Sequence, residues 1–294
     1  DEVLQLAEVV KDHPGTTPEW VTDGCLRGFT EDEIDLMIEM SLRGRRPINW
    51  NVLTIDSAEP ERYRHQLSAS EKAEQRGAKV VALTMPTLVG MNMSFLNYCA
   101  LNQMPDWGDI LALPVPERIE KLKDPAVRIF MENRAASPEA GVFARLTGWG
   151  RYRIGDTYSP DNEGLKGRLV ADIARERGVR DFFALLDIVI ADDLRTVLWP
   201  GPTDDDAESW RLRAEAWESG YTMIGGSDAG AHLDRMCGAA YTTEWLGDCI
   251  RGKKLTTLEK AVRHLTDVPA RLFGLTGRGR IAEGGIADVV VFDP

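Results

Sequence analysis

Residues 78–86, AKVVALTMP, form an unbroken apolar run that ends at a proline. A run of this kind is typical of a strand that is buried in a parallel sheet. The chain before it predicts a helix over 30–44, a strand rich in β-branched and aromatic residues over 46–55, and a second helix over 60–77. The order helix, strand, helix, strand indicates an α/β fold.

The pattern changes over residues 87–163, which carry many Pro, Met, Trp and Asn residues and only short helical pieces. We interpret this segment as a long insertion, either a lid or a substrate-facing subdomain. After it the α/β pattern resumes. The predicted elements are a helix over 165–178, a segment over 181–193 in which helix is favoured over strand, a short strand over 195–199, a helix over 204–220, a strand over 221–227 and a last helix that opens at Thr256.

Polar residues mark the starts of three predicted helices. Thr30 with Glu33, and Thr256 with Glu259, have the spacing of a capping box. Three consecutive aspartates at 204–206 can suggest a cation site, but a helix N-terminus that attracts negative charge explains them better.

Composition limits the classes of function. The 294 residues suit one large domain or two small ones, and a hydrophobic content of 43% is enough for a sizeable core. The net charge of −12 argues against a nucleic-acid partner and against an anionic membrane surface. No apolar run reaches the roughly 18 residues that a bilayer span needs. Cys25, Cys99, Cys237 and Cys249 include no CxxC pair, so we expect reduced thiols and a cytoplasmic protein.

A glycine-rich turn follows the strand predicted at 221–227, in the sequence YTMIGGSDAGAH. The turn puts Ser227 and Asp228 at the carboxyl end of the strand, where catalytic groups collect in α/β sheets and barrels. A carboxylate there can take a proton from an attacking water and later give it to a leaving group. In the alternative interpretation Asp228 caps the following turn and His232 is a surface residue.

Four stretches carry a resemblance to a known family. The C-terminal sequence TTLEKAVRHLTDVPARLFGLTGRGRIAEGGIADVVVFDP, residues 256–294, resembles the end of the metal-dependent amidohydrolase superfamily. SDAGAHLD at 227–234 resembles the end of the eighth barrel strand in the branch that includes the N-acyl-D-amino-acid deacylases, also called D-aminoacylases. GRRPINWNVL at 44–53 and LTMP at 83–86 look like later strands of the same branch.

The resemblance implies an α/β fold of the (β/α)8 TIM-barrel type. In this chain we expect an incomplete barrel over residues 1–280, with the insertion at about 87–163, and the first strand of a small β-sandwich domain over 281–294. The implied activity is hydrolysis of linear amides, carbon–nitrogen bonds other than peptide bonds, in small N-acyl amino acid-like substrates. A hydroxide bound to zinc or another divalent metal would attack the carbonyl, Asp228 would transfer the proton, and His232 would contact substrate.

The departures from the family pattern are as informative as the match. The superfamily has an H-x-H metal-binding pair on its first barrel strand, but here the only histidines are His13, His65, His232 and His264, and no two of them are two residues apart. His65 and His264 lie in predicted helices, where a packed or solvated imidazole is expected. The metal ligands therefore stay unassigned.

The number of candidate strands, four or five where a barrel needs eight, points the same way. We expect the chain to be the C-terminal part of a longer enzyme, inactive or weakly metal-binding by itself. We also expect its open edges to be covered in a homo-oligomer. The alternative is a non-catalytic amidohydrolase-like protein that serves binding or assembly. Cys237 is interpreted as a buried thiol rather than a metal ligand, and the eight tryptophans as packing residues.

Overall fold

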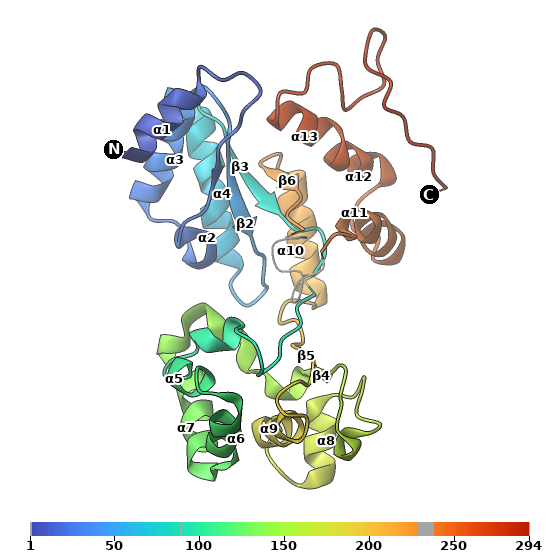
Figure 1. The fold of residues 1–294 in the computed structure, drawn as a ribbon. Coiled ribbons are helices and arrows are strands. Elements are labelled where there is room, and N and C mark those ends of the chain that lie inside the picture. The colour runs from blue at the N-terminus through green and yellow to red at the C-terminus, as the bar shows by residue number, and fades with distance from the viewer. Residues whose placement is uncertain (1, 89, 228–237, 294) are drawn as a thin grey trace. The chain divides into compact units, whose positions relative to one another are not determined.

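The computed structural model describes residues 2–88, 90–227 and 238–293, and the chain divides into two compact units (Figure 1). The described part of unit 1 comprises 2–88, 204–227 and 238–293, and that of unit 2 comprises 90–203. Each unit has its own hydrophobic core. Among the helices of the described residues, none has the length and apolar content that crossing a membrane requires.

Unit 1 is built on a parallel sheet whose strand order in the described residues is β1-β2-β3-β6. The strands are β1 (Glu19–Trp20), β2 (Ile48–Leu53), β3 (Val80–Thr84) and β6 (Thr222–Ile224). The helices of this unit are α1 (Glu2–Val10), α2 (Gly24–Arg27), α3 (Glu31–Gly44), α4 (Pro60–Gln75), α10 (Ala207–Glu218), α11 (Tyr241–Glu244), the π-helix η5 (Trp245–Gly252), α12 (Leu258–Leu265) and α13 (Asp267–Leu272).

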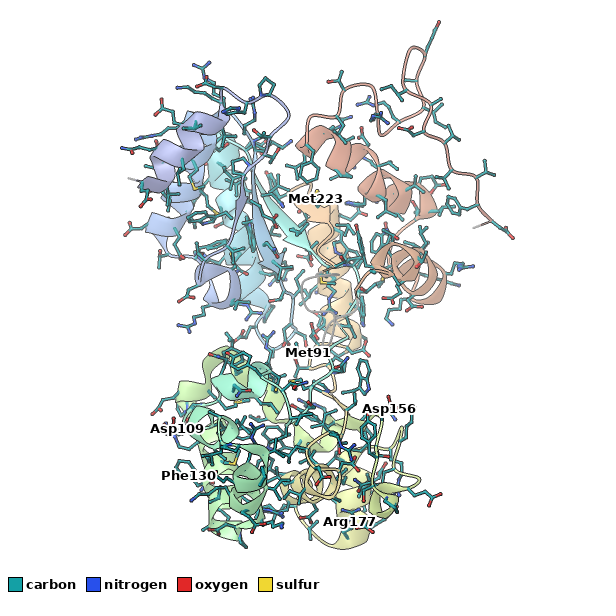
Figure 2. The ribbon with its side chains drawn as sticks, viewed as in Figure 1. Met91, Asp109, Phe130, Asp156, Arg177 and Met223 are labelled. Carbon is teal, nitrogen blue, oxygen red and sulfur yellow. The ribbon has the colours of Figure 1, made fainter. Side chains whose placement is uncertain are left out.

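Strand β3 is buried on both faces, as its apolar sequence predicts. Val80 belongs to the core that also contains Ile38 of α3, beside β2 and β3 in Figure 1. On the other face Leu83 packs in a small cluster with Met223 of β6, labelled in Figure 2, and Leu272 of α13. The parallel α/β architecture predicted from the sequence is confirmed, whereas closure into a barrel stays a prediction.

The predicted capping box at the start of α3 is confirmed. The Glu33 amide donates to Thr30 Oγ1 at 3.2 Å, and the Thr30 amide donates to Glu33 Oε2 at 2.9 Å. The same helix ends at Gly44, as expected. A Cβ on Gly44 would lie 2.8 Å from the carbonyl oxygen of Ala7, so glycine allows the close packing of α1 against α3.

The second predicted capping box is wrong by one residue. Helix α12 begins at Leu258 and its N-cap is Thr257, whose Oγ1 accepts from the Lys260 amide at 3.4 Å. The Thr256 hydroxyl instead donates to the carboxylate of Glu218 on α10. Both threonines can cap a helix, and the residue type alone does not distinguish them.

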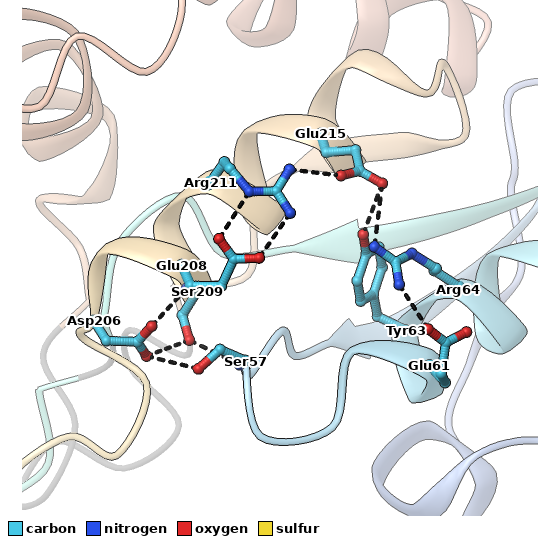
Figure 3. A network of polar contacts seen from close by, with 9 residues as sticks. All are labelled: Ser57, Glu61, Tyr63, Arg64, Asp206, Glu208, Ser209, Arg211 and Glu215. Atoms are coloured by element: carbon cyan, nitrogen blue, oxygen red, sulfur yellow. Dashed lines mark hydrogen bonds and ion pairs between the residues drawn. The ribbon is translucent and has the colours of Figure 1, made fainter.

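Helices α4 and α10 are joined by a polar network, shown in Figure 3. The Tyr63 hydroxyl of α4 donates to Glu215 of α10 at 3.1 Å. Arg211 holds Glu215 at 3.2 Å and pairs with Glu208 at 2.7 Å within α10. At the start of α10 the Ser57 hydroxyl, which follows β2 in the chain, donates to Asp206 at 3.1 Å. The outer helices of neighbouring strands are thus linked by side chains along most of the length of α10.

Unit 2 is mainly helical. Its elements are the 3-10 helix η1 (Ala100–Gln103), α5 (Gly108–Leu111), α6 (Val115–Lys123), α7 (Pro125–Ala135), the 3-10 helices η2 (Pro138–Thr147) and η3 (Trp149–Arg151), β4 (Arg153–Ile154), the 3-10 helix η4 (Pro160–Asn162), α8 (Val170–Arg177), α9 (Asp181–Ala191) and β5 (Leu198–Trp199). The segment over 181–193, for which helix was favoured, is helical as α9.

Aromatic stacking fills the centre of unit 2. The rings of Trp107 and Trp149 are 5.7 Å apart and nearly parallel, and Phe182 of α9 lies 4.8 Å from Trp149. The Trp107 indole N–H donates to the carbonyl of Met131 on α7 at 2.9 Å. The prediction that the tryptophans are packing residues is confirmed for this pair, but Trp199 is 40% exposed.

The short strand predicted over 195–199 forms, but it does not continue the parallel sheet. β5 pairs antiparallel with β4, in a sheet that has these two strands in the described residues. The backbones of Met93 and Leu198 also exchange two hydrogen bonds, of 2.9 and 2.8 Å. This strand is therefore paired within unit 2, and the expectation that the α/β alternation has resumed at this point is wrong for it.

The β-sandwich strand expected over 281–294 is not formed in the described residues 281–293. Ile281 is 96% exposed and Val291 is 93% exposed. A strand needs a neighbouring strand to receive its backbone hydrogen bonds, and the described residues offer none beside this segment. The described residues 281–293 thus contain no strand, and the β-sandwich domain expected from there stays a prediction.

Burial of His264 predicts a dependence of stability on pH. His264 is 6% exposed, its Nδ1 has no hydrogen-bond partner, and its ring meets Trp245 edge-on. Burial, with the nearby charges of Arg263 and Lys260 outweighing that of Glu218, lowers the pKa of His264 below its usual 6.5. The unfolded chain therefore takes up this proton first, and the free energy of unfolding falls as pH falls below about 6.5.

We expect His264→Phe to remove part of this pH dependence, as measured by urea unfolding between about pH 5 and pH 8. His13→Asn, a change at an exposed turn, serves as the control and should leave the slope unaltered. An identical slope in the wild type and in the His264→Phe variant would contradict the assignment.

Candidate functional site

The carboxyl ends of β2, β3 and β6 meet at one edge of the sheet in unit 1. The Thr84 hydroxyl, at the end of β3, donates to the Leu53 carbonyl of β2 at 3.2 Å. The Gly225 amide, just after β6, donates to the Thr84 carbonyl at 3.0 Å. Thr84 is buried, so both contacts are protected from water. This edge is where α/β proteins present catalytic groups.

Two glycines shape the turn that follows β6. A Cβ on Gly225 would lie 2.8 Å from Leu83 Cδ1. Gly226 has φ = +83°, a backbone conformation that side chains disfavour, and a Cβ there would lie 3.2 Å from Leu83 Cδ2. The turn therefore packs directly on β3 and sets the direction in which the chain continues through Ser227.

Asp228 and His232, the two residues predicted to act in catalysis and substrate binding, lie outside the described residues, and so does Cys237. The residues on either side of the segment 228–237, Ser227 and Gly238, are described. Asp228 is bonded to Ser227 at the carboxyl edge of the sheet. The chain is described again from Gly238, where a Cβ would lie 2.3 Å from the carbonyl oxygen of Ser227. Ser227 and Gly238, the described residues on either side of 228–237, are therefore in contact.

The other histidines do not gather at this edge. His65 of α4 has its Nε2 2.8 Å from the Phe29 carbonyl, a contact that ties α4 to the segment before α3. His264 is buried beside Trp245, as described above. Both imidazoles thus have the structural surroundings expected from the sequence.

Cys249 contacts the chain just beyond the carboxyl end of β3. Its Sγ donates to the carbonyl of Pro86, two residues after β3, at 3.0 Å. Burial raises the pKa of Cys249 to about 12, and burial also raises the pKa of Cys25. Both are therefore protonated at neutral pH, a state that does not suit a nucleophile.

The aspartates at 204–206 have structural roles, as their place before a helix predicts. Asp206 is the N-cap of α10 and accepts from the Ser209 amide at 2.9 Å. Hydrogen bonds from Ser209 and then Ser57 lower its pKa to about 2 (Figure 3). Asp205 accepts from the Trp210 indole at 2.7 Å, and Asp204 forms an ion pair with Arg213.

A metal centre requires several converging ligands. In residues 2–88, 90–227 and 238–293, no three His, Cys, Asp or Glu side chains lie close enough together to hold a metal ion. The described residues alone do not fit a metal centre.

The fold and this edge agree with the family relationships of the chain. The model of the amidohydrolase family matches residues 2–294, so the chain belongs to the amidohydrolase family. It is 57% identical over 51 residues to the N-acyl-D-glutamate deacylase of Alcaligenes xylosoxydans xylosoxydans, a match that covers 17% of this chain and 10% of that protein. It is 34% identical over 132 residues to the D-aminoacylase of the same organism, covering 44% and 25%.

Solved structures give the same fold. An N-acyl-D-glutamate deacylase from Bordetella bronchiseptica, crystallised with zinc and a phosphonate inhibitor, aligns with a TM-score of 0.50 at 20% identity. A D-aminoacylase aligns with a TM-score of 0.51 at 20% identity. Both alignments cover 98% of this chain and 48% of the other, so the chain spans about half the length of these relatives.

The packing of Gly225 on β3 yields a test by a double-mutant cycle. We expect Gly225→Ala to lower the free energy of unfolding by about 1–3 kcal/mol, because the added methyl group overlaps Leu83. In a Leu83→Ala background the same change should cost clearly less. Gly90→Ala, which meets nothing within 4 Å, is the matched control. Equal costs in both backgrounds, measured by urea unfolding, would refute the contact.

Proposed function

We propose that this chain forms part of a metal-dependent hydrolase that cleaves the linear amide bond of N-acyl amino acids. The observation that carries the proposal is the turn after β6. In a member of the amidohydrolase family, a glycine pair packed against Leu83 leads the chain to Ser227 at the carboxyl edge of a parallel sheet, and Asp228 is the next residue in the sequence. The kinship with N-acyl-D-glutamate deacylase and D-aminoacylase supports this class of substrate.

In this proposal Asp228 transfers the proton. Water adds to the acyl carbon while the carboxylate of Asp228 takes one of its protons. The tetrahedral adduct then collapses, the carbon–nitrogen bond breaks, and the same proton passes to the leaving nitrogen. The products are a carboxylic acid and an amine. His232, four residues further along, is proposed to contact the substrate.

A divalent metal, most simply zinc, is part of the proposal because relatives have been solved with zinc or with a binuclear metal centre. The described residues do not assemble a site for it. We propose that ligands from outside these 294 residues complete the site. A cytoplasmic location is also proposed, since the cysteines of the sequence include no CxxC pair.

The role of Asp228 is tested by Asp228→Asn in an active preparation that contains this chain. The amide cannot accept a proton, so turnover of an N-acyl-D-amino acid should fall about 100-fold or more. Asp193→Asn, which removes an exposed carboxylate in unit 2, is the matched control and should retain activity. Unchanged turnover in Asp228→Asn would overturn the acid/base role and would favour a non-catalytic amidohydrolase-like protein.

Metal content gives a second test. After dialysis without chelator, we expect the chain of residues 1–294 to hold clearly less than one equivalent of zinc by mass spectrometry, since its described residues gather no ligand cluster. One full equivalent that disappears in Asp228→Ala would contradict this expectation. It would show that the segment 228–237 and its surroundings suffice for metal binding.

A further inference from the structure

Unit 2 contains a hollow of about 1190 Å³ that the proposed catalysis does not use. Two segments far apart in the sequence form its centre, GWGR at 148–151 and WPGP at 199–202. Both are rich in glycine and aromatic residues. The volume is of the order of a small-molecule site, which is commonly several hundred to about 1,000 Å³.

Glycines let these two segments touch. A Cβ on Gly201 would lie 2.7 Å from the carbonyl oxygen of Arg151, so the backbones are in direct contact. A Cβ on Gly148 would lie 2.4 Å from Nη2 of Arg151. The guanidinium therefore occupies the space that a side chain at position 148 would need. The glycines therefore determine where the positive charge of Arg151 lies.

The guanidinium of Arg151 has no protein partner in the described part of the chain. No ion pair and no hydrogen bond joins it to another described side chain. Two acidic groups also line the hollow: Glu132 pairs with Arg180 at 2.7 Å, and the carboxylate of Asp181 lies against Gly150. The lining arginines Arg151, Arg153 and Arg180 outnumber these two acids, and a concave surface with an excess of positive charge attracts an anion.

A second cation and an aromatic surface lie beside it. Arg153 and Trp199 are opposite each other in the β4–β5 ladder, so their side chains stand on the same face. Arg153 is fixed by a hydrogen bond from its Nη1 to the Gly167 carbonyl at 2.5 Å. The indole of Trp199 remains 40% exposed.

We propose that this hollow binds a small organic carboxylate that carries an aromatic or similarly flat apolar group. Arg151 takes the carboxylate through paired N–H donors, with Arg153 adding positive charge, and Trp199 packs on the apolar group. The binding does not depend on proton transfer by Asp228, so either proposal can fail without the other.

Phenylacetate is a suitable probe because it has both features and no amide to hydrolyse. Ligand-observed NMR titration of the whole chain should show saturable binding. 2-Phenylethanol, which is neutral and otherwise similar, should bind about tenfold more weakly or worse. Hydrogen exchange measured by mass spectrometry should show that phenylacetate protects peptides containing 147–153 and 199–202.

Two variants distinguish the loss of the Arg151 charge from its displacement. Arg151→Gln should weaken phenylacetate binding about tenfold or more. Gly148→Ala retains every charge but displaces the guanidinium, and because the displaced atoms end a flexible side chain, the fold should survive while affinity falls. Arg177→Gln, an exposed arginine of α8 labelled in Figure 2, is the matched control and should bind as the wild type does.

The result that would overturn the proposal is equally definite. If phenylacetate shows no saturable binding, or binds folded Arg151→Gln as tightly as the wild type, the hollow is not a carboxylate site. Trp199→Leu provides the independent check, with circular dichroism to confirm folding. Unchanged affinity in that variant would remove the aromatic part of the proposal.

Discussion

Strand β3 is enclosed on every side, with hydrogen-bonded strands along both edges and apolar side chains over both faces. Its backbone groups can be satisfied only by β2 and β6, because a buried amide without a partner is costly. The register of the sheet follows from this requirement, with Leu83 opposite Met223. Alignment of the strands then brings their carboxyl ends to one edge, and the turn that leads to Asp228 begins there.

The parts of the fold that were predicted from sequence are those encoded locally. The apolar run at 78–86 and the Thr30–Glu33 box each carry their signal within a few residues, and both are present as expected. The partner of a strand is not encoded locally. Nothing in RTVLW at 195–199 distinguishes a strand of the main sheet from one that pairs antiparallel with Arg153–Ile154.

The candidate site also has features that local sequence predicts and features that depend on contacts between distant residues. The glycine turn and the position of Asp228 after a strand can be found from sequence, because spacing and residue type suffice. The contact between Gly225 and Leu83 cannot, because it depends on a register between strands 140 residues apart in the chain. The hollow around Arg151 cannot be predicted from sequence for a similar reason. Its glycines at 148 and 201 look like ordinary loop residues until the fold brings the two segments together.

The paired backbones of Met93 and Leu198 have a consequence for how such a chain arises. These two residues lie near the start and the end of the stretch 90–203 that belongs to unit 2, so their pairing brings the two ends of the stretch close together. An insertion whose ends lie close together is tolerated by a host fold. Substitutions in unit 2 can therefore change the hollow around Arg151 during evolution. The parallel sheet of unit 1, which precedes Asp228 in the chain, need not change with them.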